Sequence, residues 1–154
     1  MAVAPNTTFV SGAILTAAQQ NAFPRGIMGK AISTVNTSAT TSATDLTGMS
    51  ITFTAVVDRL YRATFSGFCQ QSTTSRIFVK MTDSAGTQFD QSISGIASAG
   101  TNVFTVITAV YLFTATGSIT RKIQSQTDTG TATWFGATAD VRSYSFTIED
   151  IGGV

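Results

Sequence analysis

Residues 49–70, MSITFTAVVDRLYRATFSGFCQ, contain the pattern that decides the fold. In residues 49–55 an apolar side chain stands at every second position, with Ser or Thr between. The alternation returns in residues 60–70, after the short segment Val57-Asp58-Arg59. A period of two is typical of a half-buried β-strand. Two such runs joined by a short turn predict an antiparallel hairpin.

The rest of the chain from Ile27 onward repeats this pattern of strands and turns. Asp83-Ser84-Ala85-Gly86 predicts a tight turn, since Asp favours its first position and Gly its last. Further strands are expected at 27–35, 76–82, 87–93, 103–116, 118–127, 131–135 and 140–149. This gives about eight or nine strands and no β-α-β crossover. The pattern predicts an all-β fold, an antiparallel jelly-roll-like β-sandwich.

The N-terminal part of the chain differs from the body. Residues 1–15 lack a helical period and a hairpin signal, and we expect them to be extended. Thr16 is a suitable N-cap for a short helix over 17–22, which the sequence Phe23-Pro24-Arg25-Gly26 ends. We therefore expect an N-terminal docking arm with one short helix over 1–26, a sandwich over 27–150 and a flexible tail over 151–154.

Composition excludes several classes of partner. The 154 residues are 43% hydrophobic and 11% charged, with a net charge of +1 and scattered Lys and Arg. Nucleic-acid binders carry clustered basic residues, so no nucleic-acid partner is expected. No window approaches the ~20 apolar residues of a membrane span, and no membrane partner is expected. A single cysteine, Cys69, fits folding in a reducing cytoplasm.

The sequence offers little for catalysis. It contains no histidine, which removes the commonest general base and metal ligand. Four of the eight carboxylates, those of Asp45, Asp58, Asp83 and Asp128, fall in predicted loops or turns, where Asp caps its own backbone. Cys69 falls on the expected buried face of its strand. We therefore expect no enzyme activity, no catalytic residues, no metal and no cofactor.

Two features favour interaction with other proteins. Residues 103–116 are apolar at odd and even positions alike, although a half-exposed strand should alternate. A loop or the helix of the same chain could cover the second face, or a neighbouring subunit could. The subunit-interface residues are then Phe104, Val106, Val110 and Leu112. The arm is the second feature, because it is apolar without an obvious strand partner. It packs on its own body or docks on a partner through Phe9, Val10, Ile14, Leu15, Phe23, Pro24 and Arg25.

Three segments resemble small structural proteins of tailed bacteriophages of actinobacteria, described as minor capsid (decoration) or minor tail proteins. Residues 9–26 resemble a shared opening with the pattern G-x-x-L-T-A-A-x-x-N-x-x-P-R-G. Residues 51–62 are similar to the first hairpin of that family, and residues 146–152 to a common V-E-D-I-G ending. The segments span the whole chain. The resemblance implies a β-sandwich presented by an N-terminal segment that binds the particle, with no catalytic residues.

The first hypothesis is a capsid decoration protein on the outer surface of the virion head. Its partners would be the major capsid protein and further copies of itself, with a homotrimer expected. The alternative is a minor tail or receptor-binding protein that recognises a host surface glycan. In that alternative, Trp134 and the Ser/Thr-rich loops would contact the glycan.

Overall fold

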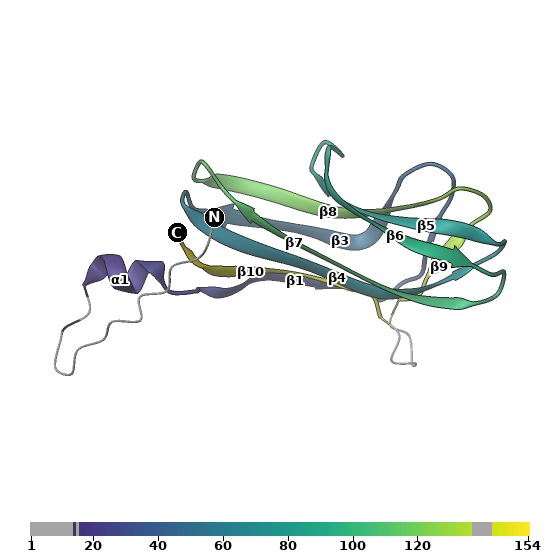
Figure 1. Cartoon of the computed structure of the whole chain (residues 1–154), viewed down its shortest axis with the longest axis horizontal. Coiled ribbons are helices and arrows are strands. Elements are labelled where there is room, and N and C mark those ends of the chain that lie inside the picture. Colours follow the sequence, from purple (N-terminus) through teal and green to yellow (C-terminus); the bar gives the residue numbers. More distant parts are fainter. Residues whose placement is uncertain (1–13, 15, 137–142) are drawn as a thin grey trace.

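The computed structural model describes residues 14, 16–136 and 143–154. These residues form one short helix and ten β-strands, drawn in Figure 1. The elements are α1 (Ala17–Ala22), β1 (Gly26–Ile32), β2 (Thr37–Ala39), β3 (Thr44–Ala55), β4 (Arg59–Gln71), β5 (Ser75–Asp83), β6 (Gln88–Ala97), β7 (Asn102–Leu112), β8 (Gly117–Thr127), β9 (Ala132–Trp134) and β10 (Ser145–Gly153).

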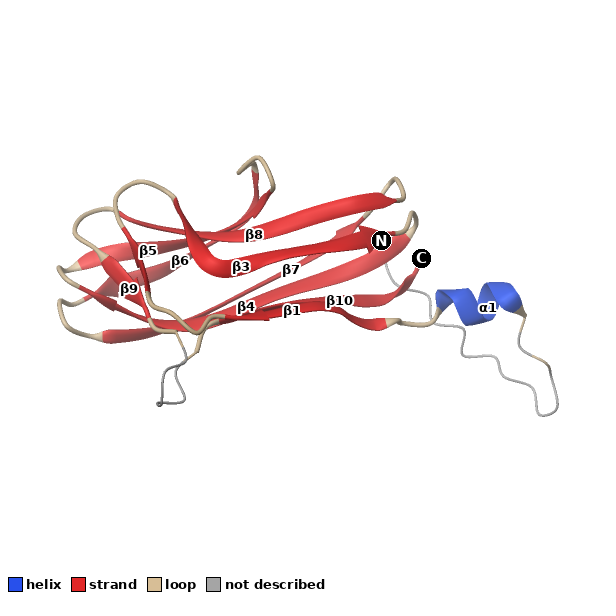
Figure 2. Cartoon of the chain, turned by 180° about the vertical axis from the view of Figure 1, so that it is seen from behind, coloured by secondary structure: helices blue, strands red, loops and turns tan. Residues whose placement is uncertain are grey.

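The strands form two antiparallel sheets packed face to face, seen as two layers in Figures 1 and 2. The first sheet has the order β1-β10-β4-β7, and the short strands β9 and β2 extend it beside β4. The second sheet has the order β3-β8-β5-β6. The main antiparallel pairs are nested in the sequence: β5 pairs with β6, and the strands on either side pair in turn as β4 with β7, β3 with β8 and β1 with β10. This is a long hairpin rolled into two sheets, which is the jelly-roll topology.

The predicted all-β sandwich is confirmed, with ten strands where about eight or nine were expected. The additional short strand β2 lies in the Ser/Thr-rich segment 36–47, between the strands expected at 27–35 and 49–55. Its side chains are not apolar enough to mark a strand, but β9 supplies a pairing partner from about a hundred residues away. The last strand continues to Gly153, although 151–154 was expected as a loose tail, because Gly152 and Gly153 pair with the start of β4.

The quoted hairpin forms as expected. Asp58 has a φ of 58° in the turn between β3 and β4, a conformation that Asp tolerates better than most residues. The alternating positions of both strands are buried between the sheets. These buried side chains are Met49, Ile51, Phe53, Ala55, Tyr61, Ala63, Phe65 and Cys69. The period of two in the sequence therefore becomes one continuous face of the core.

An aromatic cluster fills the core between β4, β9 and β10. The ring centroids of Phe65 and Trp134 are 5.4 Å apart, and Tyr144 completes the group at 6.4 Å from each. The buried Tyr144 hydroxyl lies 2.8 Å from Thr37 Oγ1 and 3.1 Å from the carbonyl oxygens of Val35 and Thr47. The segment around β2 is thus held to the core by a satisfied buried polar group.

Candidate interaction surfaces

The helix α1 lies beyond one end of the sandwich, beside the C-terminal strand (Figures 1 and 2). Its N-cap is Thr16, as the sequence predicts. Thr16 Oγ1 accepts a hydrogen bond from Gln19 N at 3.2 Å, and Gln19 Oε1 accepts one from Thr16 N at 2.8 Å. This capping box stabilises the first turn. A helix of six residues is too short to be stable alone, so contacts with the body must hold it.

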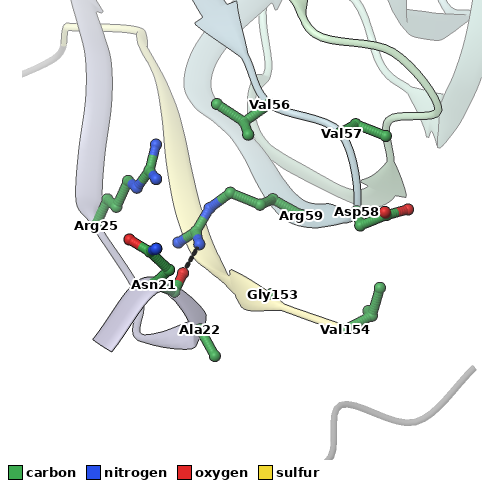
Figure 3. A pocket seen from close by; sticks show the side chains of 9 residues that line it. All are labelled: Asn21, Ala22, Arg25, Val56, Val57, Asp58, Arg59, Gly153 and Val154. Atoms are coloured by element: carbon green, nitrogen blue, oxygen red, sulfur yellow. Dashed lines mark hydrogen bonds between the residues drawn. The ribbon is translucent and has the colours of Figure 1, made fainter. Parts of the chain in front are cut away.

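Arg59, the first residue of β4, makes those contacts. Its guanidinium donates to the backbone carbonyl oxygens of Asn21 and Phe23, at the C-terminal end of α1. Figure 3 shows the Arg59 side chain directed toward Asn21. A cation is favourable at this end of a helix, where carbonyl groups lack partners within the helix. The side chain thereby fixes where the N-terminal segment leaves the sandwich.

Asp150 of β10 holds Arg59 from the other side. Arg59 Nε and one terminal nitrogen donate to the two carboxylate oxygens at 2.6 and 2.7 Å. The side chains are 4% and 0% exposed, so the ion pair is buried. Asp150 Oδ1 also accepts from Gly152 N at 3.0 Å. The hydrogen bond to Asp150 raises the pKa of Arg59 further above its usual value. We call this group, Arg59 with Asp150 and the carbonyls of Asn21 and Phe23, the arm clamp.

All three segments that carry the family resemblance meet at the arm clamp. Asn21 and Phe23 belong to the opening segment, Arg59 to the hairpin segment and Asp150 to the closing segment. The closing segment supplies polar contacts at the end of β10. Glu149 pairs with Arg62 at 2.5 Å on the exposed side of the same strands.

The predicted docking residues are only partly within the described residues. Phe9, Val10 and Leu15 lie outside them. Ile14 is 93% exposed, and Phe23 is 42% exposed. Pro24 and Arg25 are exposed as well, and Arg25 lines an open pocket of about 330 Å³ between α1, the β3–β4 turn and the C-terminal strand. The described docking residues are therefore accessible to a partner.

The strand β7 carries the predicted subunit-interface residues. Its odd positions face the core, where Ile107 is buried. Its even positions face outward, and Phe104, Val106 and Val110 are 55%, 49% and 54% exposed. Leu112 is half-buried. The Phe104 ring packs on Phe68 with centroids 4.7 Å apart. No described loop or helix covers these side chains.

Beside this strand, sequence reasoning missed an arginine enclosed by aromatic rings. Arg121 lies between Ile119 and Ile123 on the inward face of β8. Its guanidinium carbon is 4.7, 5.3 and 5.5 Å from the ring centroids of Phe89, Phe113 and Tyr111, respectively, distances at which cation–π attraction acts. The group borders an open pocket of about 390 Å³ between β6 and β7 that Asp90 also lines. The signal in the sequence was a charged residue, Arg121, on the otherwise apolar face of an alternating strand.

The outward face of the first sheet has a third hollow, of about 370 Å³, which is polar. It is lined by one exposed ion pair and three hydroxyl groups, contributed by Arg62, Glu149, Thr64, Thr108 and Thr147. The Thr64 and Thr108 hydroxyls are 3.4 Å apart across β4 and β7. The lining of this hollow is polar, and its one cation and one anion cancel.

The residues considered for catalysis or sugar binding, Cys69 and Trp134, are buried in the core. Cys69 is buried, and burial raises the pKa of its thiol to about 12, so its reactive thiolate is suppressed. Trp134 has no exposed surface and cannot serve as the sugar platform considered for the alternative function. Among the described residues, no three His, Cys, Asp or Glu side chains are grouped to hold a metal ion.

No protein-family model matches this chain, and no curated protein sequence is significantly similar to it. No helix in the described ranges has the length and apolar character needed to cross a bilayer.

Proposed function

We propose that this chain is a structural protein of a tailed-bacteriophage virion, a minor capsid protein that decorates the outer surface of the assembled head. It would be made in the host bacterial cytoplasm and would bind the major capsid protein without acting as an enzyme. The observation that carries this proposal is the arm clamp. Three separate segments that resemble phage structural proteins converge there, at the base of the segment expected to dock on the particle.

The arm clamp supports a docking function because it holds a segment that contributes little to the sandwich core. The core is formed by the strands, and α1 lies outside it (Figure 1). Burying an Arg–Asp pair is a costly way to gain stability alone, since apolar replacements are often as stable. A buried pair that sets the direction of an exposed segment is better explained by recognition. Binding only to assembled shells would stabilise those shells by mass action.

Head binding can be tested with purified protein and purified heads that lack it. We expect the full chain to co-sediment with heads and to raise their resistance to heat or low salt. Ile14→Asp should abolish binding without changing protein stability, because Ile14 is 93% exposed. Ile32→Asp is the matched control, since Ile32 is 48% exposed in β1 of the sandwich. Equal binding by the Ile14 and Ile32 variants would contradict docking through the arm.

The polar hollow favours the second candidate, a minor tail or receptor-binding protein that recognises a host glycan. Neighbouring hydroxyls and an Arg–Glu pair are groups that can hydrogen-bond a sugar. Trp134 cannot contact a glycan, because its side chain is fully buried. Quantitative mass spectrometry of purified virions separates the candidates. A decoration protein should be present in numbers comparable with the major capsid protein, whereas a tail-tip protein should be far rarer. The expected homotrimer stays a prediction.

A further inference from the structure

The strand β7 is the terminal strand of the first sheet, and its sequence is unusual for that position. Among the described strands it pairs with β4 alone, in eleven consecutive residue pairs without a register shift. From Asn102 to Leu112 it contains no charged residue, proline or glycine. Edge strands usually carry such residues or a bulge, which prevent pairing with another chain. A long, regular and uncharged edge is therefore suited to a specific partner strand.

The outward side chains of β7 are self-complementary. They are, in order, Phe104, Val106, Thr108, Val110 and Leu112. The order is nearly symmetric about Thr108, with a valine on each side of it and a large apolar residue at each end. If two copies pair antiparallel around Thr108, Val106 of one lies opposite Val110 of the other. Phe104 then lies opposite Leu112, and Thr108 opposite its own copy. Apolar pairs across antiparallel strands are favourable, and no like charges meet.

The charges beside this edge also suit a second copy. The pocket along Thr108–Tyr111 contains one cation, Arg121, and one anion, Asp90. In a two-fold contact each copy contributes both, so that each charge can find an opposite one.

We infer that two copies of this chain pair antiparallel along their β7 edges, with a two-fold axis at Thr108. The occupant of the edge is thus a second copy of the same strand, and the sheet β1-β10-β4-β7 continues into its counterpart. This inference goes beyond the proposed function, because the dimer would form in free protein irrespective of its place in a virion. It also differs from the homotrimer expected from the sequence, which would require two different surfaces in contact.

Sedimentation equilibrium of the full chain tests the dimer directly. We expect a mass twice the 16.1 kDa of one chain, with dissociation on dilution. Val106→Lys should weaken the dimer roughly tenfold or more, because a charge then faces Val110 of the second copy. Adding Val110→Glu should restore it, since the new lysine and glutamate lie opposite each other twice. Adding Val110→Lys instead should not. Thr54→Lys on exposed β3 is the control.

A covalent test does not depend on the stability of the charged variants. Thr108→Cys should form a disulfide-linked dimer under mild oxidation, since residues opposite each other in antiparallel strands have Cα atoms about 4.5–5.5 Å apart. Thr54→Cys should remain uncrosslinked at the same protein concentration, and the buried Cys69 should not contribute. A monomer at all concentrations, a trimer, or a dimer insensitive to both the lysine and the cysteine substitutions would overturn the inference. Head binding can succeed in each of those cases, which keeps the two proposals separable.

Discussion

Replacing Arg59 by Ala should destabilise the protein far more than replacing its neighbour Arg62. Arg59 and Asp150 are 4% and 0% exposed, whereas Arg62 and Glu149 are 48% and 30% exposed. Breaking a buried ion pair leaves an uncompensated charge and costs about 3–5 kcal/mol. An exposed pair contributes about 0–1 kcal/mol. The two arginines stand three positions apart in β4, so Arg62→Ala is a closely matched control.

Thermal denaturation of the two variants measures this difference. For a domain of this size about 1 kcal/mol corresponds to a 2–4 °C shift in Tm. The expected loss for Arg59→Ala is therefore roughly 6–20 °C, against less than about 4 °C for Arg62→Ala. The double variant Arg59→Ala with Asp150→Ala should lose less than the sum of the single variants, because it leaves no unpaired charge. Equal losses for Arg59→Ala and Arg62→Ala would refute the reasoning.

The Arg59 variant should also release α1. Arg59 donates to the carbonyls of Asn21 and Phe23, and six helical residues cannot remain folded alone. Trypsin should then cut after Arg25 faster than in the parent protein, at a temperature where both sandwiches are folded. An unchanged cleavage rate would show that other contacts hold the helix.

Three further results follow from the core. Gly67→Ala should cost about 1–3 kcal/mol in urea denaturation, because the new methyl group would lie 2.5 Å from Tyr144 Cβ, whereas Gly117→Ala, with no heavy atom within 4 Å, should cost almost nothing. Similar losses at the two glycines would be inconsistent with this packing. The Cys69 thiol should resist a thiol reagent at pH 8 in native protein and react fully in urea, since burial raises its pKa to about 12; rapid native reaction would contradict its burial. The pKa of this thiol is 9.0 in the unfolded chain and about 12 in the folded protein. The stability that the protonated thiol contributes is therefore complete below pH 9 and is lost as the pH rises toward 12. Urea denaturation at about pH 8 and at about pH 10.5 should show a lower midpoint at the higher pH.

The sequence allowed the fold to be predicted because its strands alternate strongly. Ile77, Val79 and Met81 of β5, and Phe146 and Ile148 of β10, are buried as their period of two requires. The short strand β9 lies inside the strand expected at 131–135, whereas β2 could not be predicted, since its three residues carry no period. Its existence depends on pairing with β9 from the far end of the chain.

The interaction surfaces were predictable in part. The outward apolar residues of β7 were visible because they break the expected alternation, and they are exposed. The arm clamp was not visible, since Arg59 and Asp150 are 91 positions apart and each looked like an ordinary polar residue near a turn or strand end. A sequence pattern identifies faces of strands, whereas a buried polar pair between distant segments depends on the three-dimensional register.

Cryo-electron microscopy of the intact virion tests the proposed function most directly. The proposal predicts a jelly-roll density repeated over the outer surface of the head, with the end that carries α1 directed toward the capsid shell. A bare head, with this density confined to the tail, would contradict it and favour host recognition.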